Sequence, residues 1–259
     1  EATNMVGADI HLDYPSVGAT ENIMLAATCA KGRTIIRNAA KEPEITDLQN
    51  FINSMGGKVA GAGSNTIVIE GVDSFHETEY TVIPDRIVAG TYLIAAAITG
   101  SEIVVENVIL EHVQATVNKL REAGCIITPY KGTGIDIVKI KAPHRLRAVE
   151  NTKTYPYPGF PTDMQALLMS ALTVSKGTSI ITENIFENRF KHVPELIRMG
   201  ARIRTEGKIA VIQGVPRLKG AEVNAGDLRG GAALVMAGLN AEGETIIDNA
   251  AMEPEIVDL

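Results

Sequence analysis

The sequence contains no tryptophan and few other aromatic residues, which limits the kind of core it can build. Aromatic residues make up 4% of the 259 positions, whereas hydrophobic residues as a whole make up 45%. A chain of this length can bury one large core or two modest ones. We therefore expect one or two domains whose cores are aliphatic and rich in alanine, as suits closely packed helices.

Cysteine is also scarce. Cys29 and Cys125 lie far apart in apolar surroundings, and the sequence has neither a CxxC pair nor a Cys/His spacing typical of a metal site. A reduced, cytoplasmic compartment is the simpler interpretation. We therefore predict no metal site and a cytoplasmic protein.

Positive charge and long apolar runs are lacking too. Lys and Arg number 24 against 31 Asp and Glu, a net charge of −7, whereas nucleic-acid binders concentrate basic residues on one face. The longest apolar runs, 23–30 and 92–98, fall short of the ~20 residues that cross a bilayer, and no signal-peptide pattern opens the sequence. We expect neither nucleic acid nor a membrane as partner, but a small molecule or another protein.

What the sequence does contain is an internal repeat. The segment 32–48 (GRTIIRNAAKEPEITDL) recurs as 243–259 (GETIIDNAAMEPEIVDL), with looser copies at 100–108 and 177–185. Each copy follows a stretch rich in Ala, Met, Leu and Ile that is typical of a helix, and each helix is expected to end at a glycine in the αL conformation. These helices are predicted over 19–30, 87–98, 164–174 and 231–239.

A second helix follows each repeated segment. In the first copy its apolar residues recur at i, i+3 and i+4 from Ile45 to Met55, and it stops at Gly56, as its counterparts stop at Gly124 and Gly200. Two strands then close a β-α-β-α-β-β unit. Three copies are complete, near 5–72, 75–142 and 145–215, and a fourth runs from about Leu218 to Leu259.

The fourth copy stops inside its second helix, which leaves an amphipathic helix unfinished. A unit that buries one face against its own helices needs neighbours to cover the rest. We therefore expect the chain to be a fragment or a rearranged protein, and we expect the uncovered apolar edge to promote self-association.

Three further blocks carry a resemblance to a known family: 13–24 (DYPSVGATENIM), 157–166 (YPGFPTDMQA) and 182–190 (TENIFENRF). With the repeat, they resemble the UDP-N-acetylglucosamine 1-carboxyvinyltransferases over about residues 5–247. The resemblance implies an α/β fold, the inside-out α/β barrel of repeated βαβαββ units in two domains, incomplete here. Residues 1–83 would be the last unit of the catalytic-loop domain. Residues 84–259 would be most of the second domain, with units at about 84–142, 145–215 and 218–259.

The resemblance also implies an activity. Members of this family transfer the enolpyruvyl group of phosphoenolpyruvate to the 3′-hydroxyl of UDP-N-acetylglucosamine, the first committed step of bacterial peptidoglycan synthesis, on which cell-wall growth, cell shape and cell division depend. Both substrates are small molecules, and no cofactor is implied. Two alternatives stay open: a shikimate-branch enolpyruvyl transferase with the same fold, and an inactive module that only binds the sugar nucleotide.

Site residues follow from the same blocks. By resemblance Asp163 accepts the proton of the attacking hydroxyl, and Ile185 contacts the sugar nucleotide through its backbone. The residues implied to bind UDP-N-acetylglucosamine are Tyr14, Pro15, Ser16, Val17, Gly18, Asp163 and Ile185. The possible cleft residues are Arg86, Arg189, Asp227 and Arg229.

Most of these residues also have plain structural interpretations. Ser16 suits a helix cap and Gly18 a close approach of two chains, while Asp163 suits a helix N-terminus. Ile185 fits a core position by its pattern. Arg86 and Arg229 are expected in structural ion pairs, and Arg189 with His192 suits a solvated helix face or a carboxylate pair.

The sequence departs from the family in two places. Family members carry their acid catalyst, a cysteine, on a mobile loop that precedes the first block. Neither Cys29 nor Cys125 occupies such a position, and we expect both to be buried structural thiols. In addition, Gly230 and Gly231 stand where the family usually has small residues other than glycine.

Overall fold

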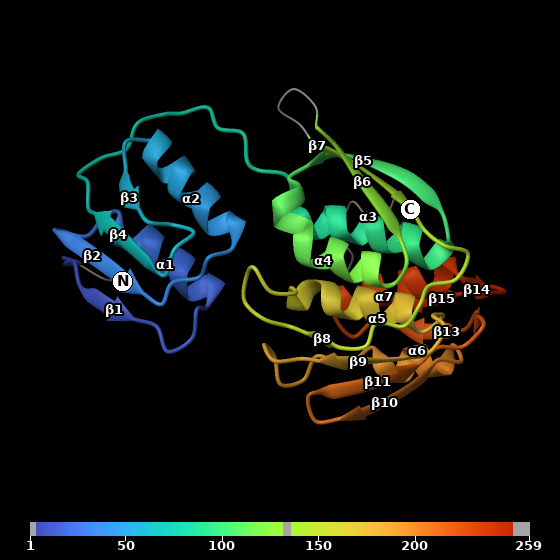
Figure 1. Ribbon diagram of the computed structural model, residues 1–259. Coiled ribbons are helices and arrows are strands. Elements are labelled where there is room, and N and C mark those ends of the chain that lie inside the picture. Colours follow the sequence, from blue (N-terminus) through green and yellow to red (C-terminus); the bar gives the residue numbers. More distant parts are fainter. Residues whose placement is uncertain (1–3, 132–135, 251–259) are drawn as a thin grey trace. The chain divides into compact units, whose positions relative to one another are not determined.

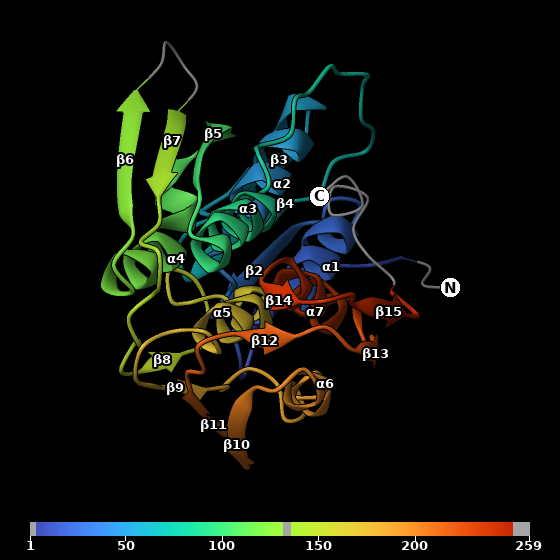
Figure 2. The same ribbon diagram turned by 90° about the vertical axis from the view of Figure 1, so that its right-hand side faces the viewer.

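The structure is a computed structural model that describes residues 4–131 and 136–250. It divides into two compact units (Figures 1 and 2). The first contains the chain up to Ile83 together with Pro156–Pro158, and the second contains Pro84–Tyr155 and the chain from Gly159 onward. Each unit is described by itself.

The first unit is one four-stranded sheet with two helices. Its strands run in the order β1-β2-β4-β3, in which β1 is parallel to β2 and the other pairs are antiparallel. Its elements are β1 (Asp9–His11), α1 (Val17–Ala27), β2 (Arg33–Arg37), α2 (Pro43–Ser54), β3 (Lys58–Ala60) and β4 (Thr66–Glu70).

The core of this unit follows from strand alternation. In β2 and β4 every second side chain is buried, because successive side chains point to opposite faces of a sheet. Ile36, Ile67 and Ile69 thus meet Met24 of α1 and Ile45 of α2 in one cluster. Pro43 opens α2, where its missing N–H costs nothing.

The second unit repeats this plan. Its sheet β8-β9-β11-β10 has the same order and the same parallel and antiparallel pairs as the sheet of the first unit. A second sheet has the order β5-β7-β6, and two pairs of short parallel strands, β12 with β14 and β13 with β15, complete the set. The elements are α3 (Arg86–Thr99), β5 (Glu102–Val108), α4 (Leu110–Glu122), β6 (Ile126–Lys131), β7 (Asp136–Lys141), β8 (Thr152–Lys153), the 3₁₀ helix η1 (Thr162–Met164), α5 (Gln165–Leu172), β9 (Thr178–Thr182), α6 (Val193–Arg198), β10 (Arg202–Glu206), β11 (Ile209–Gln213), β12 (Leu218–Lys219), β13 (Glu222–Asn224), α7 (Leu228–Leu239), β14 (Ala241–Glu242) and β15 (Ile246–Asp248).

Three helices form the centre of the second unit. Helices α3, α5 and α7 pack against one another, with the sheets outside them (Figure 1). Every residue of α5 is buried, so its polar side chains depend on partners inside the protein. The Gln165 amide has no hydrogen-bond partner among the described residues, but other polar groups of this helix do have one. The Ser170 hydroxyl, for example, donates to the Ala233 carbonyl of α7 at 2.7 Å. The predicted aliphatic core of closely packed helices is therefore confirmed.

The ends of the helices differ in part from the prediction. The second helix of each complete copy ends as expected, with Gly56, Gly124 and Gly200 at positive φ. Of the helices that precede the repeated segments, however, only α3 ends on a glycine in the αL conformation, Gly100. The others end four or five residues before their glycine, which instead lies in the turn toward the next strand; their C-caps are Thr28, Thr173 and Asn240.

The second copy also lacks the opening strand that was predicted for it. Among the described residues, 75–84 form no strand, because this segment contacts α2 instead of pairing with a sheet. Tyr80 packs on the ring of Phe51, and its hydroxyl donates to Asp47 at 2.7 Å. The unfinished helix predicted in the fourth copy lies outside the described residues.

Candidate functional site

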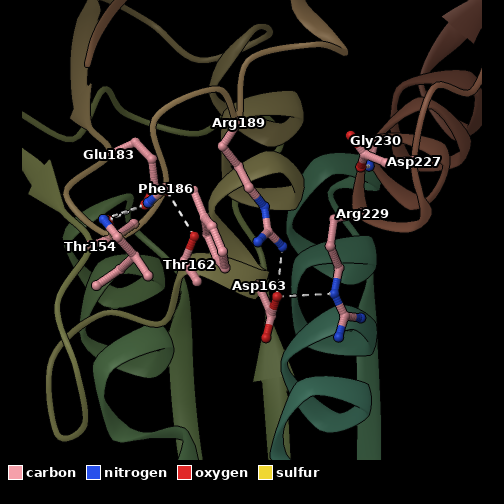
Figure 3. Close-up of polar contacts among 10 residues, drawn as sticks. Thr154, Thr162, Asp163, Glu183, Phe186, Arg189, Asp227, Arg229 and Gly230 are labelled. Atoms are coloured by element: carbon pink, nitrogen blue, oxygen red, sulfur yellow. Dashed lines mark hydrogen bonds and ion pairs between the residues drawn. The ribbon is translucent and has the colours of Figure 1, made fainter. Parts of the chain in front are cut away.

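An aspartate held by two arginines is the centre of the site. Asp163 is the second residue of η1, and its Oδ1 accepts from Arg189 Nη2 at 2.7 Å and lies 3.3 Å from Arg229 Nε. Figure 3 shows both guanidinium groups beside this carboxylate. Charge-assisted hydrogen bonds of this kind are stronger than neutral ones and orient the carboxylate.

The two arginines come from different elements. Arg189 lies between β9 and α6, and its guanidinium stands 4.7 Å from the centre of the Phe186 ring, a cation–π contact. Arg229 is the second residue of α7, whose N-cap Asp227 accepts the Gly230 N–H at 2.8 Å. Both arginine side chains are largely buried, at 18% and 17% exposure, whereas 38% of the Asp163 side chain is exposed. The carboxylate is therefore fixed and still accessible.

A buried carboxylate lies beside this group. Glu183 is 1% exposed, and its Oε1 accepts from the Thr154 hydroxyl at 2.8 Å and from the backbone N–H groups of Ile185 and Phe186 at 2.8 and 3.1 Å. Its Oε2 accepts from the Thr162 hydroxyl at 2.9 Å. The carboxylate thus joins the end of β8, the start of η1 and the loop after β9 (Figure 3).

A buried histidine follows the same loop. His192 is 4% exposed and occupies the N-cap position of α6, although its side chain makes no capping hydrogen bond. Burial lowers its pKa to about 4, with Asp227 opposing this shift and Arg189 adding to it. Its Nε2 is buried without a hydrogen-bond partner among the described residues. The imidazole is therefore neutral at pH 7.

The predicted nucleotide-binding residues of the first block lie in the first unit, at the start of α1. Ser16 is the N-cap of this helix, and its Oγ accepts the Ala19 N–H at 3.3 Å, so the predicted cap is confirmed. Gly18 does not serve a close approach of chains, because a Cβ placed there would meet no described atom within 4 Å. A pocket of about 180 Å³ lies nearby; its lining includes Pro15, Asn38, Lys41, Asn65 and Tyr157.

The structure thus brings together some of the residues singled out from the sequence. Asp163, Arg189 and Arg229 form one cluster. Asp227 caps the helix that carries Arg229, and the Ile185 N–H is bound to Glu183. Arg86 opens α3, which packs against η1. The sequence reasoning gave no role to Glu183, Thr154 and Thr162. The signal for Thr162 and Glu183 was their place inside the blocks 157–166 and 182–190, whereas Thr154 had none.

One prediction about the cysteines is wrong. Cys29 is exposed, because α1 ends at Ala27 and the chain turns there toward β2. Cys125 is buried as expected, and burial raises its pKa to about 11. Across 4–131 and 136–250, no group of His, Cys, Asp and Glu could hold a metal ion. In the same residues no helix combines the length and apolar character needed to cross a membrane.

Comparison with known protein families gives a consistent result. A sequence model of the EPSP synthase (3-phosphoshikimate 1-carboxyvinyltransferase) family matches residues 1–253. A protein of Caldanaerobacter subterraneus subsp. tengcongensis named UDP-N-acetylglucosamine 1-carboxyvinyltransferase 2 is 60% identical over 244 residues, which cover 94% of this chain and 58% of that protein. A UDP-N-acetylglucosamine 1-carboxyvinyltransferase of Myxococcus xanthus is 53% identical over 94% of this chain and 57% of its own length. The chain thus spans under two thirds of these relatives.

Solved structures establish the fold. The enolpyruvyl transferase NikO from Streptomyces tendae has a TM-score of 0.82 at 24% identity, over 96% of this chain and 61% of that one. An EPSP synthase from Acinetobacter baumannii has a TM-score of 0.67 at 22% identity, over 96% and 59%. The α/β fold predicted from the resemblance is confirmed.

Proposed function

Because the chain belongs to the EPSP synthase family of 1-carboxyvinyltransferases, we propose that it serves the transfer of an enolpyruvyl group from phosphoenolpyruvate to the 3′-hydroxyl of UDP-N-acetylglucosamine. The names of relatives that are 53–60% identical support this acceptor. The reaction is the first committed step of peptidoglycan synthesis. It would place the protein in the cytoplasm with two small-molecule substrates, in a pathway on which cell shape and division depend.

The observation that carries the proposal is the fixed but accessible carboxylate of Asp163. In the transfer, the sugar oxygen bonds to C2 of the enolpyruvyl group while C3 gains a proton, and phosphate then leaves as C3 loses one. The hydroxyl proton must go to a base within hydrogen-bond reach. Arg189 and Arg229 hold Oδ1 of Asp163, so the carboxylate can meet the hydroxyl without reorienting.

Two further features, one in each unit, suit parts of a sugar nucleotide. The start of α1 offers backbone N–H groups, and Lys41 lines the pocket nearby; both suit phosphate groups. Ile185 already donates its N–H to Glu183. The backbone group that it would present to the ligand is therefore its carbonyl oxygen, which accepts a hydrogen bond from a hydroxyl or an amide of the sugar.

A second candidate acceptor is 3-phosphoshikimate, because the matching family is described by that substrate. The test uses a version of the chain completed with those segments of the Caldanaerobacter relative that lie outside the matched region. Phosphate release from phosphoenolpyruvate is measured with each acceptor. We expect release with UDP-N-acetylglucosamine; release with 3-phosphoshikimate alone would refute the proposal.

The role of Asp163 is tested in the same protein. Asp163→Ala should lower phosphate release by about 10²–10⁴-fold, the usual contribution of a general base. The matched control is Glu102→Gln, because Glu102 is also a partly exposed carboxylate between two cations, with Lys139 at 2.5 Å and Lys141 at 3.5 Å. The control should keep full activity. Full activity in Asp163→Ala would show that another group accepts the proton.

A further inference from the structure

Glu183 has no part in the proposed chemistry, yet it is the most thoroughly bound carboxylate around the site. A charged group that is 1% exposed destabilises the fold unless its oxygens are satisfied. Here four donors satisfy them, two hydroxyl and two backbone N–H groups. Glu183 therefore connects three segments of the second unit.

These connections reach both partners of the ion pair between Asp163 and Arg189. On one side, Oε2 of Glu183 holds the Thr162 hydroxyl, and Asp163 is the next residue in η1. On the other side, Oε1 holds the Phe186 N–H, and the ring of Phe186 lies against the Arg189 guanidinium. One carboxylate thus binds the residue before Asp163 and a residue whose ring contacts Arg189.

We propose that Glu183 is a positioning residue, which sets the orientation of Asp163 and Arg189 through Thr162 and Phe186. The proposal deepens the function proposed above and rests on it for its catalytic consequence. Its structural part, the ordering of the loop after β9, holds without any ligand.

The length and the charge of this side chain both matter. Its Oε2 binds the Thr162 hydroxyl, while its Oε1 binds the Ile185 and Phe186 N–H groups. We expect Asp, which is one methylene shorter, to lose some of these contacts. Gln keeps the shape and one acceptor oxygen, but its hydrogen bonds are neutral and weaker. Ala leaves four donors, one buried and three partly buried, without this acceptor. We therefore expect the loop after β9 to be best ordered with Glu at position 183, less ordered with Gln, and least ordered with Ala.

The first arm of the test uses the 259-residue chain and nuclear magnetic resonance. In Glu183→Ala the Ile185 and Phe186 amides should exchange with solvent at least about tenfold faster, because they lose their acceptor. Glu183→Gln should give a smaller increase. The Ile181 amide, inside the ladder of β9, is the internal reference. Glu187→Gln, which removes an exposed carboxylate from the same loop, is the matched control and should change neither amide.

A second readout follows the ion pair directly. The guanidinium N–H signals of Arg189, assigned with Arg189→Lys, should broaden in Glu183→Ala, while those of Arg37 stay as they are. Arg37 is a suitable reference because it is paired with Asp9 in the first unit, at 2.8 and 2.9 Å. A variant that merely loses stability would not broaden one arginine selectively. Unchanged Arg189 signals, or unchanged exchange in both variants, would overturn the proposal.

The second arm measures kinetics in the completed protein. Glu183→Gln should lower kcat by about tenfold or more, since small misplacements of reacting groups cost up to about a hundredfold, and Glu187→Gln should match the wild type. If the wild-type completed protein releases no phosphate, the proposed function fails, and the exchange arm still decides on the loop. If the wild-type completed protein releases phosphate and Glu183→Gln keeps the same kcat, the proposal that Glu183 positions Asp163 and Arg189 is wrong.

Discussion

Acid should destabilise the second unit through His192. Its pKa is about 4 in the folded chain, against an ordinary value of 6.5, because burial disfavours the imidazolium form. Between these values the unfolded chain binds a proton that the folded chain excludes. The free energy of unfolding is therefore not reduced by His192 above pH 6.5, and it decreases progressively as the pH falls from 6.5 toward 4.

The size of the effect follows from the two pKa values. The full shift corresponds to about 3 kcal/mol, and by pH 5 about 2 kcal/mol of the free energy of unfolding should be gone. Neighbouring charges modulate this value: Asp227 favours the imidazolium, and Arg189 disfavours it. The variant to compare is His192→Leu, which has no titratable group at this position.

Urea unfolding followed by far-ultraviolet circular dichroism at pH 7.5, 6 and 5 measures the effect. The difference in pH dependence between wild type and His192→Leu isolates this one group, because the other histidines are present in both. His144→Gln, at an exposed histidine of the same unit, should keep the wild-type dependence. The reasoning would be refuted by an equal acid loss in His192→Leu, or by a His192 resonance that titrates near pH 6.5 in the folded chain.

Two further predictions concern the thiols and the first helix. At pH 8 a thiol reagent should label Cys29 quickly and Cys125 slowly, because the Cys125 pKa is about 11 and its side chain is buried; Cys29→Ser should remove the fast phase, and two fast thiols would contradict this. Ser16→Ala should destabilise the first unit by about 1 kcal/mol in urea unfolding, whereas Ser16→Gly should cost only a few tenths, as lost capping predicts.

Much of the fold could be predicted because the sequence repeats itself. A repeated pattern of buried residues specifies a repeated unit, and the sheets of the first and third copies indeed share one strand order. The failures were local. The pattern did not show that 75–84 would contact α2 rather than form a strand, since this depends on the partners of Tyr80, which lie far away in sequence.

The site was predictable only in its individual residues. Motif resemblance pointed to Asp163, Arg189 and Arg229, but not to their contacts, because Arg189 lies 26 positions from Asp163 in sequence and reaches it only through folding. The assignment of binding roles to Tyr14–Gly18 and Ile185 stays a prediction, as does the division into two domains of the family. Cys29 was misjudged because an apolar neighbourhood in sequence does not reveal where a helix ends.

Glu183 shows most clearly why a repeat determines architecture more firmly than function. The pair Glu106-Asn107 occupies the same place in the second copy as Glu183-Asn184 in the third. Yet Glu106 is exposed, while Glu183 is buried and bound to the Thr154 hydroxyl. The difference lies in the neighbours, because Thr154 directly follows the opening strand β8, the element that the second copy lacks. A carboxylate in a repeated position becomes a positioning group only where its own copy supplies the donors, so the chemistry of this unit depends on where the repeats diverge.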